Sequence, residues 1–234
     1  MSCFCVIGMH RSGTSCLTGI MQRMGIELGE VFTENEFNKK GNRENSTIVN
    51  VNDTLLRLHG GAWNNPVIAT EWNDAARTER DRIVKELSSQ SDNWGFKDPR
   101  ALFTLDYWME GIPDMKFIGT YRHPYRVALS LNNRDNTPIE EGMQLWKAYN
   151  QQLLKVMREH NVDLVNFDMD QEQYLADVIA KLIKLGISDS KADAASDFFD
   201  TSLRNQTGKS VDEIELPNDI AEVYGELNNY FASR

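Results

Sequence analysis

Residues that can bind an oxyanion lie together near the start of the chain, in the segment Gly8-Met-His-Arg-Ser-Gly-Thr-Ser15. Glycine lets the backbone turn tightly and approach an anion, so that successive N–H groups can point at it. The arginine adds a fork of donors that suits a tetrahedral oxyanion. The segment therefore predicts a binding loop for phosphate or sulfate, although a tight turn without a ligand would use similar residues. The predicted binding residues are Arg11, Ser12, Gly13, Thr14 and Ser15.

The sequence around this loop predicts the elements that position it. The apolar run at 3–8 reads as a buried strand, and residues 16–24 have apolar positions at helical spacing. A helix that starts at the loop would aim the positive end of its dipole at an anion. The glycine spacing matches that of an NTPase P-loop, but Thr14 stands where the P-loop lysine would be.

A second segment has the right spacing to bind another anion. Residues 116–121 read as a buried strand, and Pro124 suits the first turn of a helix. Arg122 then lies at the end of the strand, and Ser130 lies about two turns into the helix. These two side chains could converge on one anion. Taken singly, the arginine could be a surface ion pair and the serine an ordinary helix residue.

Together the two segments resemble the sulfotransferases that use 3′-phosphoadenosine 5′-phosphosulfate (PAPS). Arg-Ser-Gly-Thr-Ser is similar to their loop for the 5′-phosphosulfate, which implies that residues 11–15 bind that end of PAPS. The segment from Arg122 to Ser130 is similar to their motif for the 3′-phosphate, and these two residues are expected to bind it. The resemblance implies that the nucleotide product is 3′-phosphoadenosine 5′-phosphate (PAP) and that the transfer can rely on arginine and lysine instead of a metal.

The resemblance continues along the chain. Trp94-Gly-Phe-Lys-Asp-Pro-Arg100 is similar to a segment of bacterial and tyrosyl-protein sulfotransferases. We expect Lys97, with Arg11, to stabilise the charge that develops during transfer; the alternatives are a salt bridge from Lys97 to Asp98 or a contact with the end of a helix. Residues 162–167 resemble the last strand of the family, but residues 167–169 depart from its pattern, so no role is predicted for them. Arg204 is a further candidate for nucleotide contact.

The general base is predicted to be Glu44. It ends Gly41-Asn-Arg-Glu44, which is similar to a Gly-aromatic-aromatic-Glu segment of bacterial sulfotransferases, although Asn42 and Arg43 replace the aromatics. Glu34, Glu36 and His10 are the alternatives for this role. A carboxylate base would need a partly dry site to raise its pKa.

The predicted activity is transfer of a sulfuryl group from PAPS to a hydroxyl or amine of a small-molecule, carbohydrate, lipid or peptide acceptor. A P-loop kinase is the first alternative, and it would require Mg²⁺. A nucleotide-binding module without catalytic activity is the second. The sequence has no spacing of ligands typical of a metal site, so no metal is predicted.

Composition narrows the class of protein. The 234 residues carry a net charge of −10, which disfavours general binding to nucleic acid. There is no apolar run long enough to span a membrane and no room for a secretory signal before residue 3, which predicts a cytoplasmic protein. Cys3, Cys5 and Cys16 suit reduced, buried thiols better than a disulfide framework.

The predicted fold is α/β, a single P-loop-like domain over residues 1–234. Strands at 3–8, 94–97, 116–121 and 162–167 alternate with helical stretches, which favours a three-layer α/β/α arrangement around a parallel sheet of about four to five strands. In such sheets ligands bind at the carboxyl ends of the strands, where all the predicted site segments lie. Helices are predicted at 46–59, 74–90, 101–110, 124–134, 139–160, 171–185 and 219–231, with a loop at 26–45 and a polar segment that contains helical pieces at 186–217.

Overall fold

Four parallel strands form the sheet of this protein, whose computed structural model describes residues 2–33, 41–196 and 214–234. The strands are β1 (Ser2–Ile7), β2 (Asn93–Lys97), β3 (Lys116–Tyr121) and β4 (Asp163–Asn166). Their order across the sheet is β2-β1-β3-β4, and every neighbouring pair is parallel. The α/β class with a central parallel sheet, and the four strands expected within it, are confirmed.

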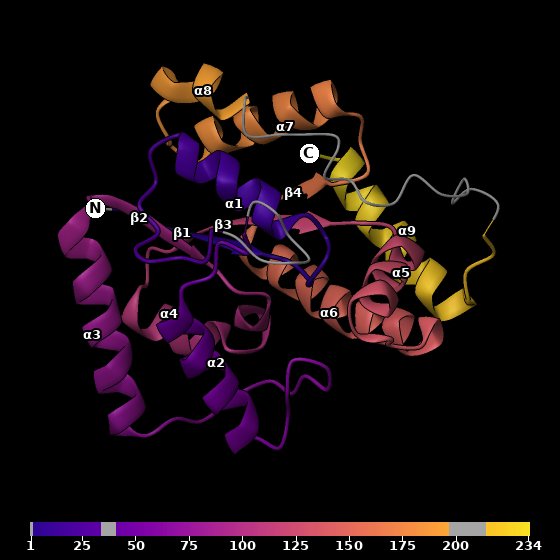
Figure 1. Cartoon of the computed structure of the whole chain (residues 1–234), viewed down its shortest axis with the longest axis horizontal. Helices are drawn as coiled ribbons and strands as arrows, with labels where there is room; N and C mark the ends of the chain where they lie inside the picture. Colours follow the sequence, from indigo (N-terminus) through magenta and orange to yellow (C-terminus); the bar gives the residue numbers. More distant parts are fainter. Residues whose placement is uncertain (1, 34–40, 197–213) are drawn as a thin grey trace.

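Nine helices surround the sheet within the described ranges. They are α1 (Thr14–Arg23), α2 (Ser46–Leu58), α3 (Asp74–Gln90), α4 (Leu105–Gly111), α5 (Pro124–Asp135), α6 (Ile139–His160), α7 (Gln171–Lys184), α8 (Ala192–Ser196) and α9 (Asn218–Ala232), with short 3₁₀ turns at Pro99–Phe103 and Asp189–Lys191. The helices cover both faces of the sheet, with α1, α7 and α8 on one side and α2, α4 and α6 on the other (Figure 1).

One predicted helix is wrong in its boundaries. The stretch at 101–110 is divided into the 3₁₀ turn and α4, and Thr104 lies between them with a φ of −122° and a ψ of 20°, which is neither helical nor extended. The Thr104 hydroxyl donates a hydrogen bond of 2.7 Å to Oδ1 of Asn52, which is fully buried in α2. A tertiary contact therefore breaks the local helical pattern here.

The alternation of side chains along β1 explains the three layers. Cys3, Cys5 and Ile7 face the larger core cluster, which includes residues of α2, α6 and α9. Phe4 and Val6 face the smaller cluster, which is built with α1 and α7. Both faces of the strand are apolar because helices cover both faces of the sheet.

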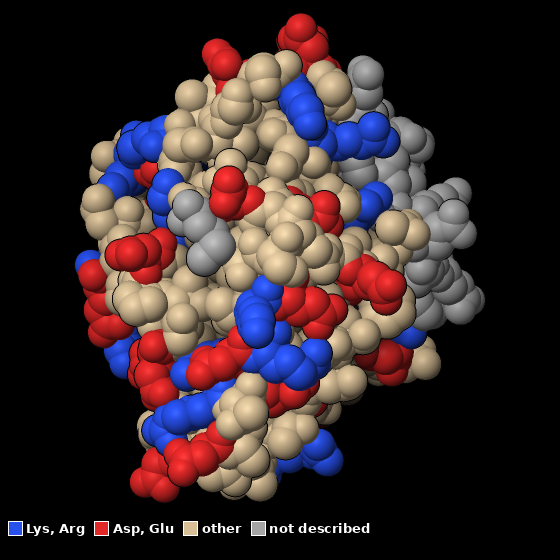
Figure 2. Space-filling model, turned by 90° about the vertical axis from the view of Figure 1, so that its left-hand side faces the viewer, with Lys and Arg blue, Asp and Glu red and all other residues tan. Residues whose placement is uncertain are grey.

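The outer face of the molecule at α3 carries charges of both signs (Figure 2). Arg82 pairs with Glu79 and Glu86 along the helix, and Arg77 pairs with Glu110 of α4 at 2.8 Å. The face therefore presents acidic and basic side chains side by side. Across the described ranges, no helix is long and apolar enough to cross a membrane.

Candidate active site

The loop that follows β1 is held tightly against the ends of β3 and β4. Gly8 has a φ of +151°, and a Cβ there would lie 2.4 Å from the main-chain oxygen of Thr120. Gly13 has a φ of +85°, and a Cβ there would lie 2.2 Å from the ring of Phe167. The Thr120 hydroxyl donates to the main-chain oxygen of Ser12 at 2.9 Å. The loop thus needs glycine at both positions, and it leads directly into α1.

The two predicted anion-binding segments meet at Arg11. Its Nε donates a hydrogen bond of 2.7 Å to the hydroxyl of Ser130 in α5, which is itself buried. Arg122 reaches the same loop, since its Nη1 donates to the main-chain oxygen of Arg11 at 3.4 Å. Burial, and then the charges of Arg134 and Arg122, lower the pKa of Arg11 to about 10. Several cations are thus gathered at one point, and this arrangement favours an anionic ligand.

Arg122 is held in place by Asp168, a residue for which no role was predicted. The Arg122 Nε lies 3.3 Å from Oδ1 of Asp168, and the Arg122 guanidinium carbon lies 5.3 Å from the centre of the Phe167 ring. Asp168 Oδ2 accepts a hydrogen bond of 2.6 Å from the main-chain N–H of His123, and Arg126 pairs with Oδ1 at 3.3 Å. The one feature of the sequence that could have indicated this role is position, because Asp168 comes shortly after β4 and Arg122 comes directly after the neighbouring strand, β3.

Lys97 and Glu44 form a close ion pair beside the loop. The Lys97 Nζ lies 2.7 Å from Oε1 of Glu44 and 3.4 Å from the hydroxyl of Ser15. The two side chains are 2% and 13% exposed, so the pair is largely shielded from water. The alternative pairing of Lys97 with Asp98 is wrong, because Asp98 instead binds Arg100 and Asn52, each at 2.8 Å.

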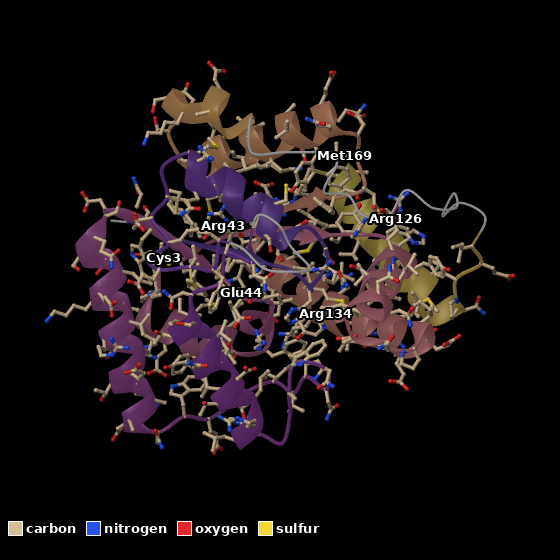
Figure 3. The ribbon with its side chains drawn as sticks, viewed as in Figure 1. Cys3, Arg43, Glu44, Arg126, Arg134 and Met169 are labelled. Carbon is tan, nitrogen blue, oxygen red and sulfur yellow. The ribbon has the colours of Figure 1, made fainter. Side chains whose placement is uncertain are left out.

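The segment before α2 brings Glu44 to this position. Asn45 caps α2, since its Oδ1 accepts a hydrogen bond of 3.0 Å from the N–H of Thr47. The main chain of Arg43 pairs with that of Phe32 at 3.0 Å, and its Nη1 donates to the Gln22 side chain at 2.6 Å. Figure 3 shows Glu44 close to the start of α2, and it also labels Arg134, which belongs to the last turn of α5. Glu44 therefore comes from a segment that is not part of the sheet.

Comparison with known proteins places this arrangement in a family. The family model described as "Sulfotransferase family" matches residues 4–185, which include every predicted site residue of the described ranges. The chain belongs to the sulfotransferase family. It is similar in fold to the solved sulfotransferase domain from the Synechococcus PCC 7002 olefin synthase, with 17% sequence identity and a TM-score of 0.59. That likeness covers 99% of this chain and 94% of the other. No curated protein matches the chain.

His10 lies in the loop of this sulfotransferase but among aromatic rings. Its ring centre is 5.3 Å from that of Trp63 and 5.7 Å from that of Tyr149, and its Nε2 is buried without a hydrogen-bond partner in the described part of the chain. Burial, followed by the charges of Arg100 and Lys97, holds the pKa of His10 well below its ordinary value of 6.5. The imidazole is therefore neutral at physiological pH.

Three further candidates cannot be placed. Glu34, Glu36 and Arg204 fall outside the described residues. Within residues 2–33, 41–196 and 214–234, His, Cys, Asp and Glu side chains form no group of three that could hold a metal ion.

Proposed function

We propose that this sulfotransferase uses PAPS as its donor and transfers the sulfuryl group to a hydroxyl or amine of its acceptor. The observation that carries the proposal is the 2.7 Å hydrogen bond between Arg11 and Ser130, which joins the two predicted anion-binding segments. A nucleotide with an anionic group at each end of its ribose matches two such segments at one edge of a sheet. ATP has no 3′-phosphate for the second of them.

The chain offers suitable groups for the 5′ side of the nucleotide. The loop at residues 11–15 precedes α1, so its N–H groups and the dipole of α1 favour a phosphosulfate there. The hydroxyl of Ser12 is buried and has no hydrogen-bond partner among the described residues, which suits a polar ligand. Arg122 and Ser130 would bind the 3′-phosphate, with Asp168 fixing the arginine. The donor fits the residues that are present.

PAPS supplies an activated sulfuryl group when it is bound. Transfer forms a bond between the acceptor oxygen and sulfur and breaks the bond between sulfur and the phosphate oxygen, which keeps the electron pair and leaves as part of PAP. In our proposal Glu44 takes the proton of the acceptor hydroxyl. Lys97 and Arg11 stabilise the negative charge that grows on the phosphate oxygen.

The Lys97–Glu44 pair, 2.7 Å apart, is suited to both roles. When Glu44 becomes protonated it no longer attracts Lys97 as an ion, so the ammonium charge is available to the leaving oxygen at the same moment. The buried location of both groups strengthens this electrostatic effect.

The test is calorimetric titration of the protein with PAP, 5′-AMP and ATP with Mg²⁺. Binding of PAP without metal, together with much weaker binding of 5′-AMP, is the expected result, since the 3′-phosphate has its own predicted site. A preference for ATP with Mg²⁺ would overturn the choice of donor and favour a kinase.

A further inference from the structure

A pocket of about 370 Å³ lies between α2 and the segment that carries Trp63. Its volume is within the range of about 300–1,000 Å³ that small-molecule sites occupy. The residues that line it are Asn50, Asp53, Thr54, Arg57, Ala62 and Trp63. None of them belongs to the predicted nucleotide-binding segments.

We propose that this pocket binds the acceptor, and that the acceptor is an uncharged, hydroxyl-rich ring such as a sugar unit. The inference rests on the proposed function, because it assigns the acceptor of the same sulfuryl transfer. It adds where the acceptor binds and to which chemical class the acceptor belongs.

Two residues that line the pocket, Trp63 and Asp53, contact residues that are close in sequence to the predicted reacting groups. The Trp63 ring lies 5.3 Å from that of His10, which directly precedes Arg11 in the loop. Asp53 pairs with Arg100 at 2.6 Å, and Arg100 bonds to Asp98, the residue after Lys97. An acceptor in this pocket would therefore lie beside both the loop and the end of β2.

Trp63 is fixed as a flat apolar wall. Its main-chain oxygen accepts a hydrogen bond of 2.8 Å from the hydroxyl of the fully buried Tyr149. The guanidinium carbon of Arg134 lies 4.8 Å from the centre of its ring. The short antiparallel bridge between Ala62 and Asn65 holds the main chain on either side. A ring that is already ordered can stack on the apolar face of a ligand at little cost in entropy.

The side of the pocket formed by α2 is polar, and it carries one acidic and one basic side chain. Asp53 is paired with Arg100, and Arg57 donates to the hydroxyl of Thr54 at 3.0 Å. Carboxylate, amide and hydroxyl groups of Asp53, Asn50 and Thr54 can exchange hydrogen bonds with several ligand hydroxyls. Because the lining contains one acidic and one basic side chain, Asp53 and Arg57, a charged acceptor of either sign would meet a like charge, and a purely apolar acceptor would remove these polar groups from water without replacing their hydrogen bonds.

The experiment measures sulfuryl transfer from radiolabelled PAPS to a panel of acceptors. The panel contains methyl β-glucoside and methyl β-galactoside as neutral sugars, glucuronate as an acidic sugar, 4-methylphenol, and a short tyrosine peptide. The same rates are measured for Trp63→Ala and Trp63→Phe. Trp72→Ala is the matched control, because Trp72 is also half-buried but bonds to Glu110 on α4, away from the pocket.

We expect a neutral sugar to be the best acceptor of the panel. Trp63→Ala should raise its KM at least ten-fold with a much smaller change in PAP affinity, Trp63→Phe should recover part of the loss, and Trp72→Ala should match the original protein. A preference for the phenol, acidic sugar or peptide would overturn the inference, as would an unchanged sugar KM in Trp63→Ala. Binding of PAP with no transfer to any panel member would overturn it too. Failure to bind PAP would instead overturn the proposed donor and remove this inference with it.

Discussion

The two halves of the candidate site hold their cations in different ways. At the ends of β1 and β2, Lys97 is neutralised by Glu44, which comes from a segment outside the sheet. At the ends of β3 and β4, Arg122 is neutralised by Asp168, which lies in the turn two residues after β4 and also accepts a hydrogen bond from the main-chain N–H of His123. A partner that is anchored next to the end of a strand fixes a cation for binding. A partner from a loop can exchange its proton or its position during a reaction.

In our proposal, the β1–β2 half carries out the chemistry and the β3–β4 half provides the affinity for the donor. Of five predictions, the first three test this division, and the last two test the packing of the loop at residues 8–15.

Glu44→Gln should have the largest effect on turnover. The amide keeps the shape and can still bond to Lys97, but it cannot take a proton, so the transfer rate should fall on the order of 10²–10⁴-fold. Single-turnover transfer from radiolabelled PAPS measures this, with the exposed Glu141→Gln as the control. Unchanged turnover would show that the base is another residue.

Lys97→Ala should lower the transfer rate by about 10²–10³-fold, because charge stabilisation at the leaving oxygen is lost. PAP affinity, measured by calorimetry, should fall much less. Lys155→Ala, which removes an exposed lysine of α6, is the control. If affinity and rate fell equally, the β1–β2 half would serve binding rather than chemistry.

Arg122→Ala should act on binding. The loss of hydrogen bonds to a charged group, worth about 1.5–3 kcal/mol each, predicts an affinity for PAP roughly 10- to 150-fold weaker. Affinity for 5′-AMP should stay nearly constant, and Arg158→Ala on the surface of α6 is the control. If the affinities for PAP and 5′-AMP fell equally, Arg122 would not bind the 3′-phosphate.

Gly13→Ala should destabilise the contact between the two halves, since its Cβ would overlap the Phe167 ring at 2.2 Å. Gly60→Ala is a matched control because Gly60 also has a positive φ, of +77°, but open space around it. We expect Gly13→Ala to cost about 1–3 kcal/mol more in free energy of unfolding than the control. Equal costs, measured in denaturant, would show that Phe167 moves aside freely.

His10→Phe should have the smallest effect, on the pH dependence of stability. The folded pKa of His10 is lowered, so the unfolded chain takes up its proton first as the pH falls. The stability that comes from the neutral ring is present above the unfolded pKa, near 6.5, and is lost below it. The original protein should thus lose stability between pH 7 and pH 5 more steeply than His10→Phe. If melting temperature changed with pH in the same way for the two proteins, the imidazole of His10 would be open to solvent.

The sequence by itself determined the parallel sheet and placed the candidate site at its edge. Apolar runs bounded by polar turns mark the four strands; Arg11 and Arg122 follow two of them, and Lys97 is the last residue of a third. Such signals are local, because a buried strand needs apolar residues wherever it lies in the chain. The loop glycines are local signals too, since positive φ angles restrict residue type.

Only the tertiary structure decided which side chains pair across the site. Asp168 with Arg122, Glu44 with Lys97, and Trp63 with His10 join residues separated by dozens of positions. Carboxylates and tryptophans occur throughout the chain, so residue type did not single these out. The pairing depends on how loops meet once strands of distant sequence are side by side, and periodicity within one segment carries no information about that meeting.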